Sequence, residues 1–359
     1  MKNVSIPLDV LRTYGLARDK ESAAALDIVH VPSLINRTYV VRSPTSSEPL
    51  VLQCLHPVFG PQVHRDIEAV TIHLRSQNFE TPRLIRTRAG ELWTVDADSR
   101  ENRVWRALSY IDGITIHKSE ELSWLESAAQ LLGRFHGALS DFEYEFVHSR
   151  PVHDTPRHLA NLELVLGSAS GQGDREAQAL GADLLRHASG VRLEFKAFPR
   201  RIVHGDPKLS NVLFRRTPPA QARCMIDLDT LGRQWLAYEL GDALRSWCNP
   251  AGEDTAAPRI DPAAFEAVML GYARARPLGM GLDEMPSAVD GVETVSLELA
   301  SRFAADVIAD SYWGWDPTRF ASRREHNLLR AKGQLALSLS VREQRATLLG
   351  LAERAFRSA

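Results

Sequence analysis

Residues 203–214 read Val-His-Gly-Asp-Pro-Lys-Leu-Ser-Asn-Val-Leu-Phe, and residues 225–230 read Met-Ile-Asp-Leu-Asp-Thr. These two segments contain a carboxylate at Asp206, an amide at Asn211 and a second carboxylate at Asp227. The apolar residues at 202–203 and 224–226 predict short buried strands beside the polar positions. The two segments therefore predict an arrangement that brings three oxygen-bearing side chains to one edge of the fold.

Polar side chains at this spacing are typical of phosphoryl-transfer sites. One carboxylate accepts the proton of the attacking hydroxyl, while two further oxygen ligands hold Mg²⁺ against the β- and γ-phosphates. Protein kinases use an Asp, an Asn five residues later and a metal-binding Asp in this order. The alternative is a Gly-Asp-Pro turn followed by an unrelated acidic loop. Either segment alone leaves both interpretations open, and the two together favour phosphoryl transfer.

The length of 359 residues exceeds that of one ordinary hydrophobic core, so we expect two lobes. The hydrophobic fraction of 44% and the charged fraction of 25% are those of a soluble globular protein. The net charge of −2 gives no electrostatic signature of a nucleic-acid or membrane partner. We expect no transmembrane helix and no signal peptide. The three cysteines lack metal-ligand spacing, which favours reduced thiols and a cytoplasmic location.

The secondary-structure pattern changes along the chain and predicts an α+β fold. Strands are predicted at 34–41, 50–55, 91–95 and 103–111, with a helix at 63–76 and a break at 112–113. Helices then dominate, at 119–139, from 155 onward, and at 176–188, 262–275, 292–311 and 322–356, with loops at 167–173 and 250–258. We expect a bilobal, protein-kinase-like architecture. Residues 1–108 would form a small β-rich nucleotide-binding lobe, and residues 109–359 a large helical catalytic and acceptor-binding lobe.

The segments at 203–214 and 226–230 resemble the phosphotransfer motif of the aminoglycoside phosphotransferase and choline kinase superfamily. The wider pattern is most similar to that of the N-acetylhexosamine 1-kinases. The shared strings lie at 34–39, 51–53, 153–156, 239–245 and 325–330. This resemblance implies that Asp206 is the catalytic base, that Asn211 and Asp227 are Mg²⁺ ligands, and that ATP is the phosphoryl donor.

Other polar residues near the motif have two interpretations each. Lys208 is either a cation that stabilises the transferring phosphoryl group or a solvated loop lysine. Asp229 either contacts a second metal ion or the acceptor, or caps the following turn. We expect Asp242 and Arg245, placed at the start of the next helix, to support the loop. His204 is expected to orient the loop, because Asp206 already suits the role of base.

Two departures from the kinase pattern concern the phosphates. Kinases cover them with a glycine-rich loop, but no glycine occurs between Gly15 and Gly60. Backbone donors in the turn at 30–36, helped by Ser33 and Asn36, would replace that loop, and an ordinary hairpin is the alternative. Gln53 stands at the position of the lysine that neutralises the α- and β-phosphates. Glu68, at the position of the helix glutamate, would hydrogen-bond Gln53 or be exposed.

The adenine is expected at the hinge around residues 107–111, beside Leu108 and Tyr110. Trp105 would either stack on the base or belong to the core.

Acceptor specificity depends on the window 301–332. Arg302, Asp306, Tyr312 and nearby tryptophans suit a polyhydroxylated ring, whereas a core stripe through Phe303 is the alternative. The window holds four acidic and six Lys or Arg residues. It therefore lacks the acidic lip that a polycationic aminoglycoside requires, and a neutral sugar fits better.

The sequence thus predicts an ATP- and Mg²⁺-dependent small-molecule kinase that phosphorylates a sugar hydroxyl, with the anomeric hydroxyl of an N-acetylhexosamine as the specific candidate. A kinase of another alcohol, of the aminoglycoside, choline or homoserine type, is one alternative. A catalytically silent nucleotide-binding scaffold is another, motivated by Gln53 and the missing glycines. The oligomeric state is not predicted.

Overall fold

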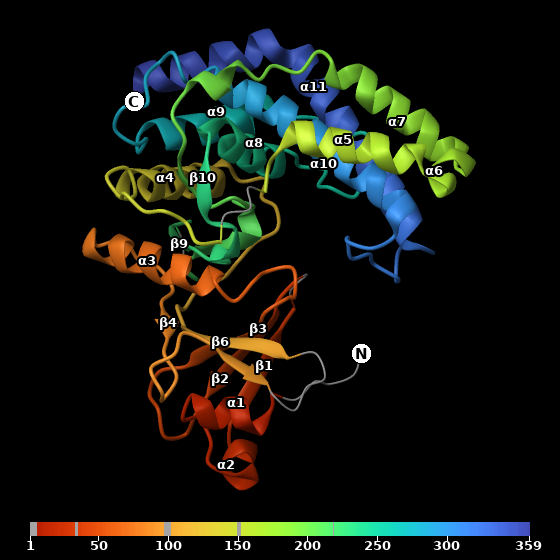
Figure 1. Cartoon of the computed structure of the whole chain (residues 1–359). Helices are drawn as coiled ribbons and strands as arrows, with labels where there is room; N and C mark the ends of the chain where they lie inside the picture. The colour runs from red at the N-terminus through yellow and green to blue at the C-terminus, as the bar shows by residue number, and fades with distance from the viewer. Residues whose placement is uncertain (1–5, 33–34, 97–101, 149–151, 218) are drawn as a thin grey trace. The chain divides into compact units, whose positions relative to one another are not determined.

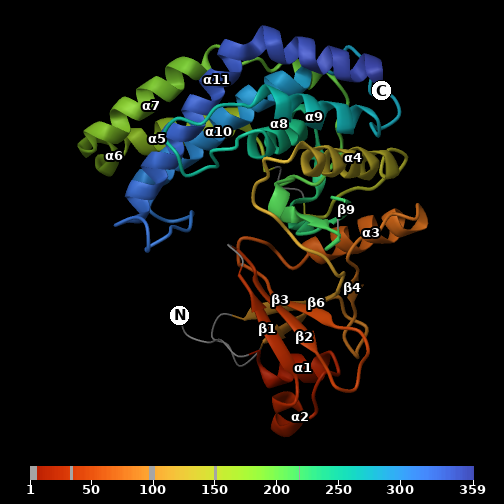
Figure 2. The ribbon, with the colours of Figure 1, turned by 180° about the vertical axis from the view of Figure 1, so that it is seen from behind.

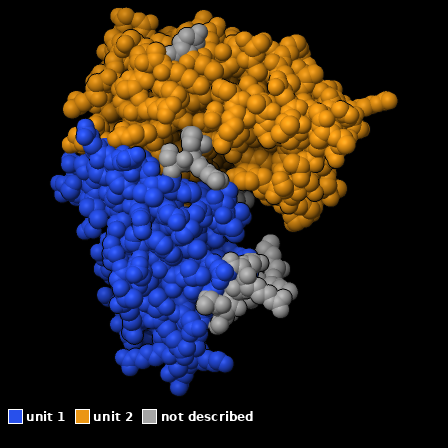
Figure 3. Space-filling model, in the orientation of Figure 1, with its two compact units in different colours: residues 1–112, 142–149 blue, residues 113–141, 150–359 orange. Residues whose placement is uncertain are grey.

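The computed structural model describes residues 6–32, 35–96, 102–148, 152–217 and 219–359. The chain divides into two compact units. Unit 1 comprises residues Met1–Asp112 and Phe142–Ser149, and unit 2 comprises Gly113–Asp141 and Arg150–Ala359 (Figure 3). The return of residues 142–149 to unit 1 was not predicted from the sequence. No helix in the described part of the chain is both long enough and apolar enough to cross a membrane.

Unit 1 is built on an antiparallel sheet with strand order β1-β2-β3-β6-β4, and β5 also pairs with β6. The strands are β1 (Asp27–Val31), β2 (Arg37–Arg42), β3 (Leu50–Cys54), β4 (Leu84–Ile85), β5 (Thr94–Asp96) and β6 (Arg103–Ser109). Its helices are α1 (Leu8–Thr13), α2 (Lys20–Ala24) and α3 (Val63–Ser76). Figure 1 shows this small sheet-containing unit, which agrees with the predicted α+β fold class.

The strands alternate between an apolar face and a more polar face. Tyr39, Leu52 and Trp105 lie in one core cluster with Val10 of α1. Trp105 is fully buried there, which supports the core alternative for this residue over stacking on a base. The predicted helix at 63–76 is confirmed in its bounds.

Unit 2 is mostly helical (Figures 1 and 2). Its α-helices are α4 (Leu122–Ala138), α5 (Thr155–Gly167), α6 (Ala169–Gly173), α7 (Arg175–Ala188), α8 (Leu236–Trp247), α9 (Pro262–Ala273), α10 (Ser287–Ala309) and α11 (Arg323–Ser358). Short 3₁₀ helices are η1 (Glu194–Ala197), η2 (Leu209–Asn211) and η3 (Leu228–Thr230). Two small antiparallel pairs join β7 (Arg201–Val203) to β10 (Gly232–Gln234), and β8 (Val212–Phe214) to β9 (Ala222–Met225).

Some helix boundaries differ from the predictions. α4 begins at Leu122, three residues later than predicted, and the Ser119 hydroxyl accepts from the Glu121 amide within the preceding turn. α5 begins at Thr155, as predicted, and the Asp154 side chain accepts from the Arg157 amide at its start. The predicted loop at 167–173 contains α6, whose cap Ser168 accepts from the Gly171 amide. Local caps of this kind satisfy the free N–H groups of a first helical turn.

The crossing of α8 and α10 is close because glycines meet there. A Cβ at Gly291 would lie 1.8 Å from the Ala237 carbonyl oxygen, and a Cβ at Gly241 would lie 2.4 Å from the Gly291 carbonyl carbon. Both distances are below van der Waals contact, so the absence of side chains sets the helix separation. This crossing fixes α8, which carries Glu239 and Asp242.

Candidate phosphotransfer site

The loop that follows β7 carries the predicted base and is shaped by Gly205. Gly205 has φ +85°, and a Cβ there would lie 2.3 Å from the Thr230 carbonyl oxygen. The Thr230 hydroxyl donates to the His204 carbonyl oxygen at 2.8 Å. These contacts pack the loop against η3, so the two segments quoted from the sequence lie together.

Asp206 has two carboxylate oxygens in different situations. Oδ2 accepts from Lys208 Nζ at 2.6 Å and from Asn211 Nδ2 at 3.1 Å. Asn211 Nδ2 also donates to the Asp206 carbonyl oxygen at 2.8 Å. Within the residues that the structure describes, Oδ1 accepts no hydrogen bond, and the side chain is 26% exposed. Oδ1 is therefore the oxygen open to an acceptor hydroxyl.

The ion pair of Asp206 and Lys208 keeps both groups charged. Burial alone would raise the pKa of Asp206, but Lys208, with smaller contributions from His204 and Arg245, lowers it. Burial alone would lower the pKa of Lys208, but the carboxylates of Asp206, Asp227 and Asp242 raise it. Asp206 is thus an ionised carboxylate at neutral pH, as a general base must be.

Asn211 and Asp227 lie at the same end of the β8–β9 pair. Val212 pairs with Met225, and the Ile226 amide donates to the Asn211 carbonyl oxygen at 2.9 Å. Asp227 adopts a left-handed conformation with φ 64°, which a short polar side chain tolerates. The backbone therefore brings the two proposed metal ligands to one place.

The donor set fits Mg²⁺. Because the nitrogen of the Asn211 amide faces two acceptors on Asp206, its Oδ1 is the atom left for another partner. Within the described ranges, no group of three or more His, Cys, Asp or Glu side chains is arranged to hold a metal ion. An amide and a carboxylate still suffice for Mg²⁺, since this ion usually keeps several waters and binds one or two protein ligands plus phosphates.

Glu239 of α8 supports the loop, and sequence reasoning did not single out this role. Its two oxygens accept from the amides of His204 and Gly205, both at 2.9 Å. His136 Nε2 lies 3.3 Å from Glu239 Oε1, and His136 Nδ1 lies 2.9 Å from the Tyr272 hydroxyl. Burial would raise the pKa of Glu239, but these hydrogen bonds and nearby charges lower it. A buried carboxylate therefore fixes the backbone before Asp206.

His204 orients the loop, as expected from the sequence. Its Nε2 lies 2.8 Å from the Ile226 carbonyl oxygen, and its Nδ1 faces the Asp206 amide at 3.3 Å. A carbonyl only accepts and a backbone amide only donates, so the proton belongs on Nε2. The ring thus links the loop of Asp206 to the segment before Asp227.

Asp242 and Arg245 lie in the later turns of α8 rather than at its start, and their hydrogen bonds do not reach the loop, on which they act only through the charges that lower the pKa of Asp206 and raise that of Lys208. Arg245 donates to Asp242 Oδ1 from Nε at 2.9 Å and from a terminal nitrogen at 2.6 Å, and it also donates to Glu253 at 3.1 Å. The Trp247 indole donates to the Pro207 carbonyl oxygen at 2.8 Å. Asp229 is buried in η3, and its role stays a prediction.

The residues predicted to bind nucleotide lie in unit 1 and have varied partners. Asn36 is buried, and its side-chain oxygen accepts from the His56 amide at 2.9 Å, which ties the turn to the end of β3. That contact supports the ordinary-hairpin alternative for Asn36. Ser33 lies outside the described residues. Leu108 is half-buried in β6, and the Tyr110 hydroxyl donates to Asp112 at 3.2 Å.

The expected partner of Glu68 is wrong. Glu68 forms an ion pair with Arg86 at 2.5 Å rather than a hydrogen bond with Gln53. Gln53 instead donates from Nε2 to the Thr38 hydroxyl at 3.0 Å and accepts at Oε1 from Arg106 Nε at 2.8 Å. The contact of Gln53 with Arg106 was not predicted, because the two residues are 53 positions apart in the chain.

Some of the residues predicted to bind the acceptor have their side chains fully engaged within the protein, whereas others are at least partly exposed. Asp306 accepts from the amides of Ser311, Tyr312 and Trp313 and from Asn327, so both of its oxygens are engaged. These bonds make Asp306 the anchor of the loop after α10 and contradict its assignment to the acceptor. Phe303 and Trp313 pack in a core cluster. Arg302 lies over the Trp313 ring at 5.0 Å, and Tyr312 is 50% exposed.

A buried polar cluster lies beside Arg302 and was not predicted. His153 Nδ1 is 3.0 Å from Glu298 Oε1, and the Thr155 hydroxyl donates to Glu298 Oε2 at 2.8 Å. Burial would lower the pKa of His153, but Glu298 and, more weakly, Asp242 raise it, while Arg302 opposes that change. The same cluster lowers the pKa of Glu298 against the effect of burial. These charges connect α10 electrostatically with α8.

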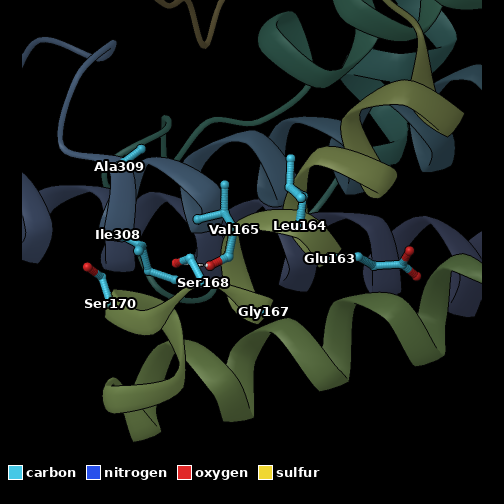
Figure 4. Close-up of a pocket in the computed structure, with 8 residues that line it drawn as sticks. All are labelled: Glu163, Leu164, Val165, Gly167, Ser168, Ser170, Ile308 and Ala309. Atoms are coloured by element: carbon cyan, nitrogen blue, oxygen red, sulfur yellow. Dashed lines mark hydrogen bonds between the residues drawn. The ribbon is translucent and has the colours of Figure 1, made fainter.

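A shallow groove of about 710 Å³ lies elsewhere in unit 2 (Figure 4). It is lined by Glu163, Leu164, Val165, Gly167, Ser168, Ser170, Ile308 and Ala309. None of the predicted site residues lines it, so the groove and the phosphotransfer loop are separate features.

The match with protein-family models defines the class. The model of the phosphotransferase enzyme family matches residues 28–278. The protein belongs to the phosphotransferase enzyme family. The match covers both the sheet of unit 1 and the phosphotransfer loop of unit 2.

Curated relatives match over a shorter region. Homoserine kinase of Pseudomonas aeruginosa strain UCBPP-PA14 is 30% identical over 150 residues, which is 41% of this chain and 45% of that protein. Homoserine kinase of strain LESB58 is 29% identical over the same coverage. The chain therefore spans less than half the length of these relatives.

Solved structures show the same fold. An aminopropanol kinase associated with a microcompartment superposes with a TM-score of 0.63 and 17% identity, covering 96% of this chain and 98% of its own. A choline/ethanolamine kinase family protein from Mesorhizobium loti gives a TM-score of 0.60 at 17% identity, covering 96% and 97%. The amicoumacin kinase hAmiN, solved in complex with AMP-PNP, Ca²⁺ and Ami, gives 0.58 at 12% identity, covering 90% and 96%. The kinase-like fold is thus confirmed.

Proposed function

We propose that the protein is an ATP- and Mg²⁺-dependent kinase of a small alcohol, with unit 1 binding the nucleotide and unit 2 the acceptor. The best candidate acceptor is the anomeric hydroxyl of an N-acetylhexosamine. The observation that carries the proposal is the carboxylate of Asp206. Lys208 and Asn211 hold one of its oxygens, and the other is left for a substrate hydroxyl. Family membership supports the reaction class.

The proposed reaction uses Asp206 as the base. Oδ1 accepts a hydrogen bond from the acceptor hydroxyl and takes its proton as the hydroxyl oxygen attacks the γ-phosphorus in line. A bond forms between that oxygen and phosphorus, and the bond between phosphorus and the bridging oxygen of ADP breaks. When bound, Mg²⁺ neutralises charge on the phosphates, and Asn211 and Asp227 would hold it. Lys208, as a flexible cation beside Asp206, can stabilise the transferring phosphoryl group.

Two features of the described residues support a sugar as the acceptor. Arg302 and Tyr312 remain available for a polyhydroxylated ring, because the first is only half-buried and the second is 50% exposed. The window 301–332, with four acids and six Lys or Arg residues, lacks the acidic lip that would recognise a polycation.

An amino alcohol such as homoserine is the second candidate acceptor. It is favoured by the 30% identity to homoserine kinase over 150 residues. An acceptor of this type carries an ammonium group, so it would require an acidic partner beside the base, and Asp229 and Asp242 are both buried in that region.

The central test is the Asp206→Asn variant. We expect turnover to fall by about 10²- to 10⁴-fold, because a positioned general base contributes that much, while binding of Mg-ATP is retained. Release of ADP with an accepted substrate measures turnover, and calorimetry measures binding. A variant that turns over at the normal rate would remove the proposed base.

The acceptor is identified by screening free sugars and amino alcohols for ADP release, followed by ³¹P NMR to locate the new phosphate. An anomeric phosphate on an N-acetylhexosamine supports the first candidate, and a phosphate on the homoserine side chain supports the second. A thermal shift with Mg-ATP but no ADP release with any acceptor would instead indicate a nucleotide-binding protein without catalytic function.

A further inference from the structure

The α10–α11 loop, residues 310–322, carries Tyr312, one of the side chains proposed to bind the acceptor. Its first residues are held from α10, because the carboxylate of Asp306 accepts from the amides of residues 311–313. Residues 314–320 have other partners, which lie on α11 and on the α8–α9 loop, residues 248–261. Two separate carboxylates therefore hold the two parts of the α10–α11 loop.

The second carboxylate is Asp254 of the α8–α9 loop. His326 Nε2 of α11 lies 2.7 Å from its Oδ1, and Arg330 Nε donates to the same oxygen at 3.2 Å. Arg330 also donates to the Gly314 carbonyl oxygen at 2.9 Å. Arg319 of the α10–α11 loop donates to Asp254 Oδ2 at 2.8 Å. Asp254 thus engages α11 with one oxygen and the α10–α11 loop with the other.

The imidazole of His326 extends this network to the backbone of the α10–α11 loop. The Asp316 amide faces His326 Nδ1 at 3.4 Å, and a backbone amide only donates, so the ring proton belongs on Nε2 and points at Asp254. Phe320 stacks on the same ring, with the ring centroids 3.9 Å apart. The His326 side chain is 1% exposed, so water does not compete for these contacts. Asp254 therefore orients the ring on which residues 316–320 rest.

Asp254 ionises more easily than its partial burial alone would allow. Burial would raise the pKa of Asp254, but the hydrogen bond from His326 and the charge of Arg330 lower it. Asp254 is thus a carboxylate at neutral pH, and a carboxylate forms stronger hydrogen bonds with these donors than a neutral amide does.

The α8–α9 loop is itself fixed on both sides. Glu253, the neighbour of Asp254, accepts from Arg245 of α8 at 3.1 Å. A Cβ at Gly333 of α11 would lie 2.2 Å from the Thr255 carbonyl oxygen, so the loop backbone packs directly on that helix. The adjacent carboxylates of Glu253 and Asp254 therefore join α8 to the α10–α11 loop.

We propose that Asp254 is a positioning residue for acceptor binding, which holds the α10–α11 loop in its binding conformation before the acceptor arrives. Asp254 touches neither nucleotide nor reacting atoms in this role. The inference rests on the proposed function, in which Arg302 and Tyr312 bind the acceptor. An ordered loop loses little conformational freedom on binding, so loosening it weakens acceptor binding by the fraction of molecules that keep the loop in place.

The test separates acceptor binding from chemistry in the Asp254→Asn variant. With an acceptor found by the screen, we expect the acceptor KM to rise about 10-fold, the factor for a loop in place in about a tenth of the molecules. At saturating acceptor, kcat and the KM for ATP should stay within about twofold of the wild-type values. An unchanged acceptor KM would overturn the proposal. A fall in kcat alone would also overturn it, because loss of folded enzyme lowers kcat and leaves KM unchanged.

Arg319→Gln is the second variant, because Arg319 is 53% exposed and its loss leaves the core intact. We expect the acceptor KM to rise about threefold, the size of one exposed ion pair. In the Asp254→Asn background the same change should have no further effect, since Arg319 acts through Asp254. Additive effects would contradict the proposal. If Asp254→Asn does not fold, Arg319→Gln decides: a rise confined to the acceptor KM supports the proposal, and no rise overturns it.

Hydrogen exchange without acceptor provides a measurement that is independent of turnover. In Asp254→Asn we expect the amides of residues 314–320 to exchange faster, whereas those of residues 311–313, held by Asp306, should keep their wild-type rates. Wild-type exchange over residues 314–320 would show that Asp254 does not hold the loop.

The matched control is Asp174→Asn. Asp174 also accepts from an arginine of α11, Arg324, at 2.8 Å, and its side chain is 21% exposed against 24% for Asp254. It caps α7, which asparagine does equally well. We expect unchanged kinetic constants, and an equal rise in acceptor KM would show a general effect of loosening α11 and overturn the proposal.

Failure of the inference and failure of the proposed function give different results. Wild-type protein that phosphorylates no acceptor would refute the proposed function, and with it the role of Asp254 in acceptor binding. Wild-type turnover with an unchanged acceptor KM in Asp254→Asn would refute only the role of Asp254.

Discussion

Gly205 and Gly90 share a φ of +85°, but only Gly205 is enclosed. A Cβ at Gly205 would lie 2.3 Å from the Thr230 carbonyl oxygen, whereas a Cβ at Gly90 would meet no atom within 4 Å. Alanine substitutions at these two glycines therefore separate two contributions to the free energy of unfolding, that of the left-handed backbone conformation and that of the steric contact.

We expect Gly90→Ala to lower the free energy of unfolding by about 1 kcal/mol, because only the left-handed backbone is strained. Gly205→Ala should lower it by at least about 3 kcal/mol, since a backbone clash adds to that strain. Urea denaturation of both variants measures the difference. Equal costs for the two variants would contradict the packing of the loop against η3.

The sequence predicted the residues of the site that are close in the chain but not those that are distant. Asp206, Lys208 and Asn211 lie within one loop, so the spacing of these residues in the sequence was enough to predict that their side chains would lie close together. Glu239 contacts His136 across 103 positions, and a single sequence contains no signal for that contact. Asp306 was assigned to the acceptor for a similar reason. The sequence does not show that the loop after α10 folds back so that its amides donate to the Asp306 carboxylate.

Among the secondary-structure elements, the close crossing of α8 and α10 depends on Gly291. A Cβ there would lie 1.8 Å from the Ala237 carbonyl oxygen, so the helices would have to separate. That movement would displace Glu239, whose carboxylate holds the amides of His204 and Gly205.

We expect Gly291→Ala to lower the free energy of unfolding by about 2–4 kcal/mol, because overpacking forces backbone shifts, and to reduce turnover. The control is Gly137→Ala in α4, where a Cβ would meet no atom within 4 Å. That variant should stabilise the protein by about 0.5–1 kcal/mol, as alanine restricts the unfolded chain and favours helix. Thermal and urea denaturation distinguish the two; a neutral Gly291→Ala would be inconsistent with the crossing.

Strand prediction succeeded where strands are half-buried. The segments expected at 34–41, 50–55 and 103–111 correspond to β2, β3 and β6. β1 was missed although Ile28, Val29 and Val31 are β-branched, because the run is short and continues into residues 30–36, which were predicted to form a turn. All five of its residues are exposed, so no buried face distinguishes it in the structure.

At the scale of the whole molecule, the division into two units could be expected from length, but the return of the chain to unit 1 could not. Asp66 of α3 accepts from the Tyr144 hydroxyl and from the amides of Val147 and His148, all at 2.8–2.9 Å. Those partners lie about 80 positions further along the chain, and the intervening α4 belongs to unit 2. A contact between residues so far apart in the chain cannot be predicted from the composition of either segment.

The global stability of the protein should depend on pH through His153 and Glu298. The folded-state pKa of His153 is raised above 6.5. Its contribution to the free energy of unfolding is therefore complete below about pH 6.5 and is lost as pH rises through the folded-state pKa. The folded-state pKa of Glu298 is lowered below 4.5, so its contribution is complete above about pH 4.5 and is lost as pH falls through the folded pKa. Asp242, His158 and Arg302 also act on this pair.

We therefore expect the destabilisation caused by His153→Gln to be largest near pH 5.5 and to shrink toward alkaline pH. Urea denaturation of wild type and variant at several pH values measures it. Thr155→Val removes the hydroxyl that is bonded to Glu298 but no titrating group. This variant should lower the free energy of unfolding by the same amount at every pH tested. A His153→Gln effect that is constant with pH would show that the imidazole is not charged in the folded state.

The exposed strand β1 has a consequence for the behaviour of the protein in concentrated solution. It is the terminal strand of its sheet and carries exposed Ile28, Val29 and Val31. Among the described strands it pairs only with β2, so its outer edge offers backbone donors and acceptors to an extended segment. Intermolecular strand addition at this edge would nucleate oligomers or fibrils without unfolding either unit.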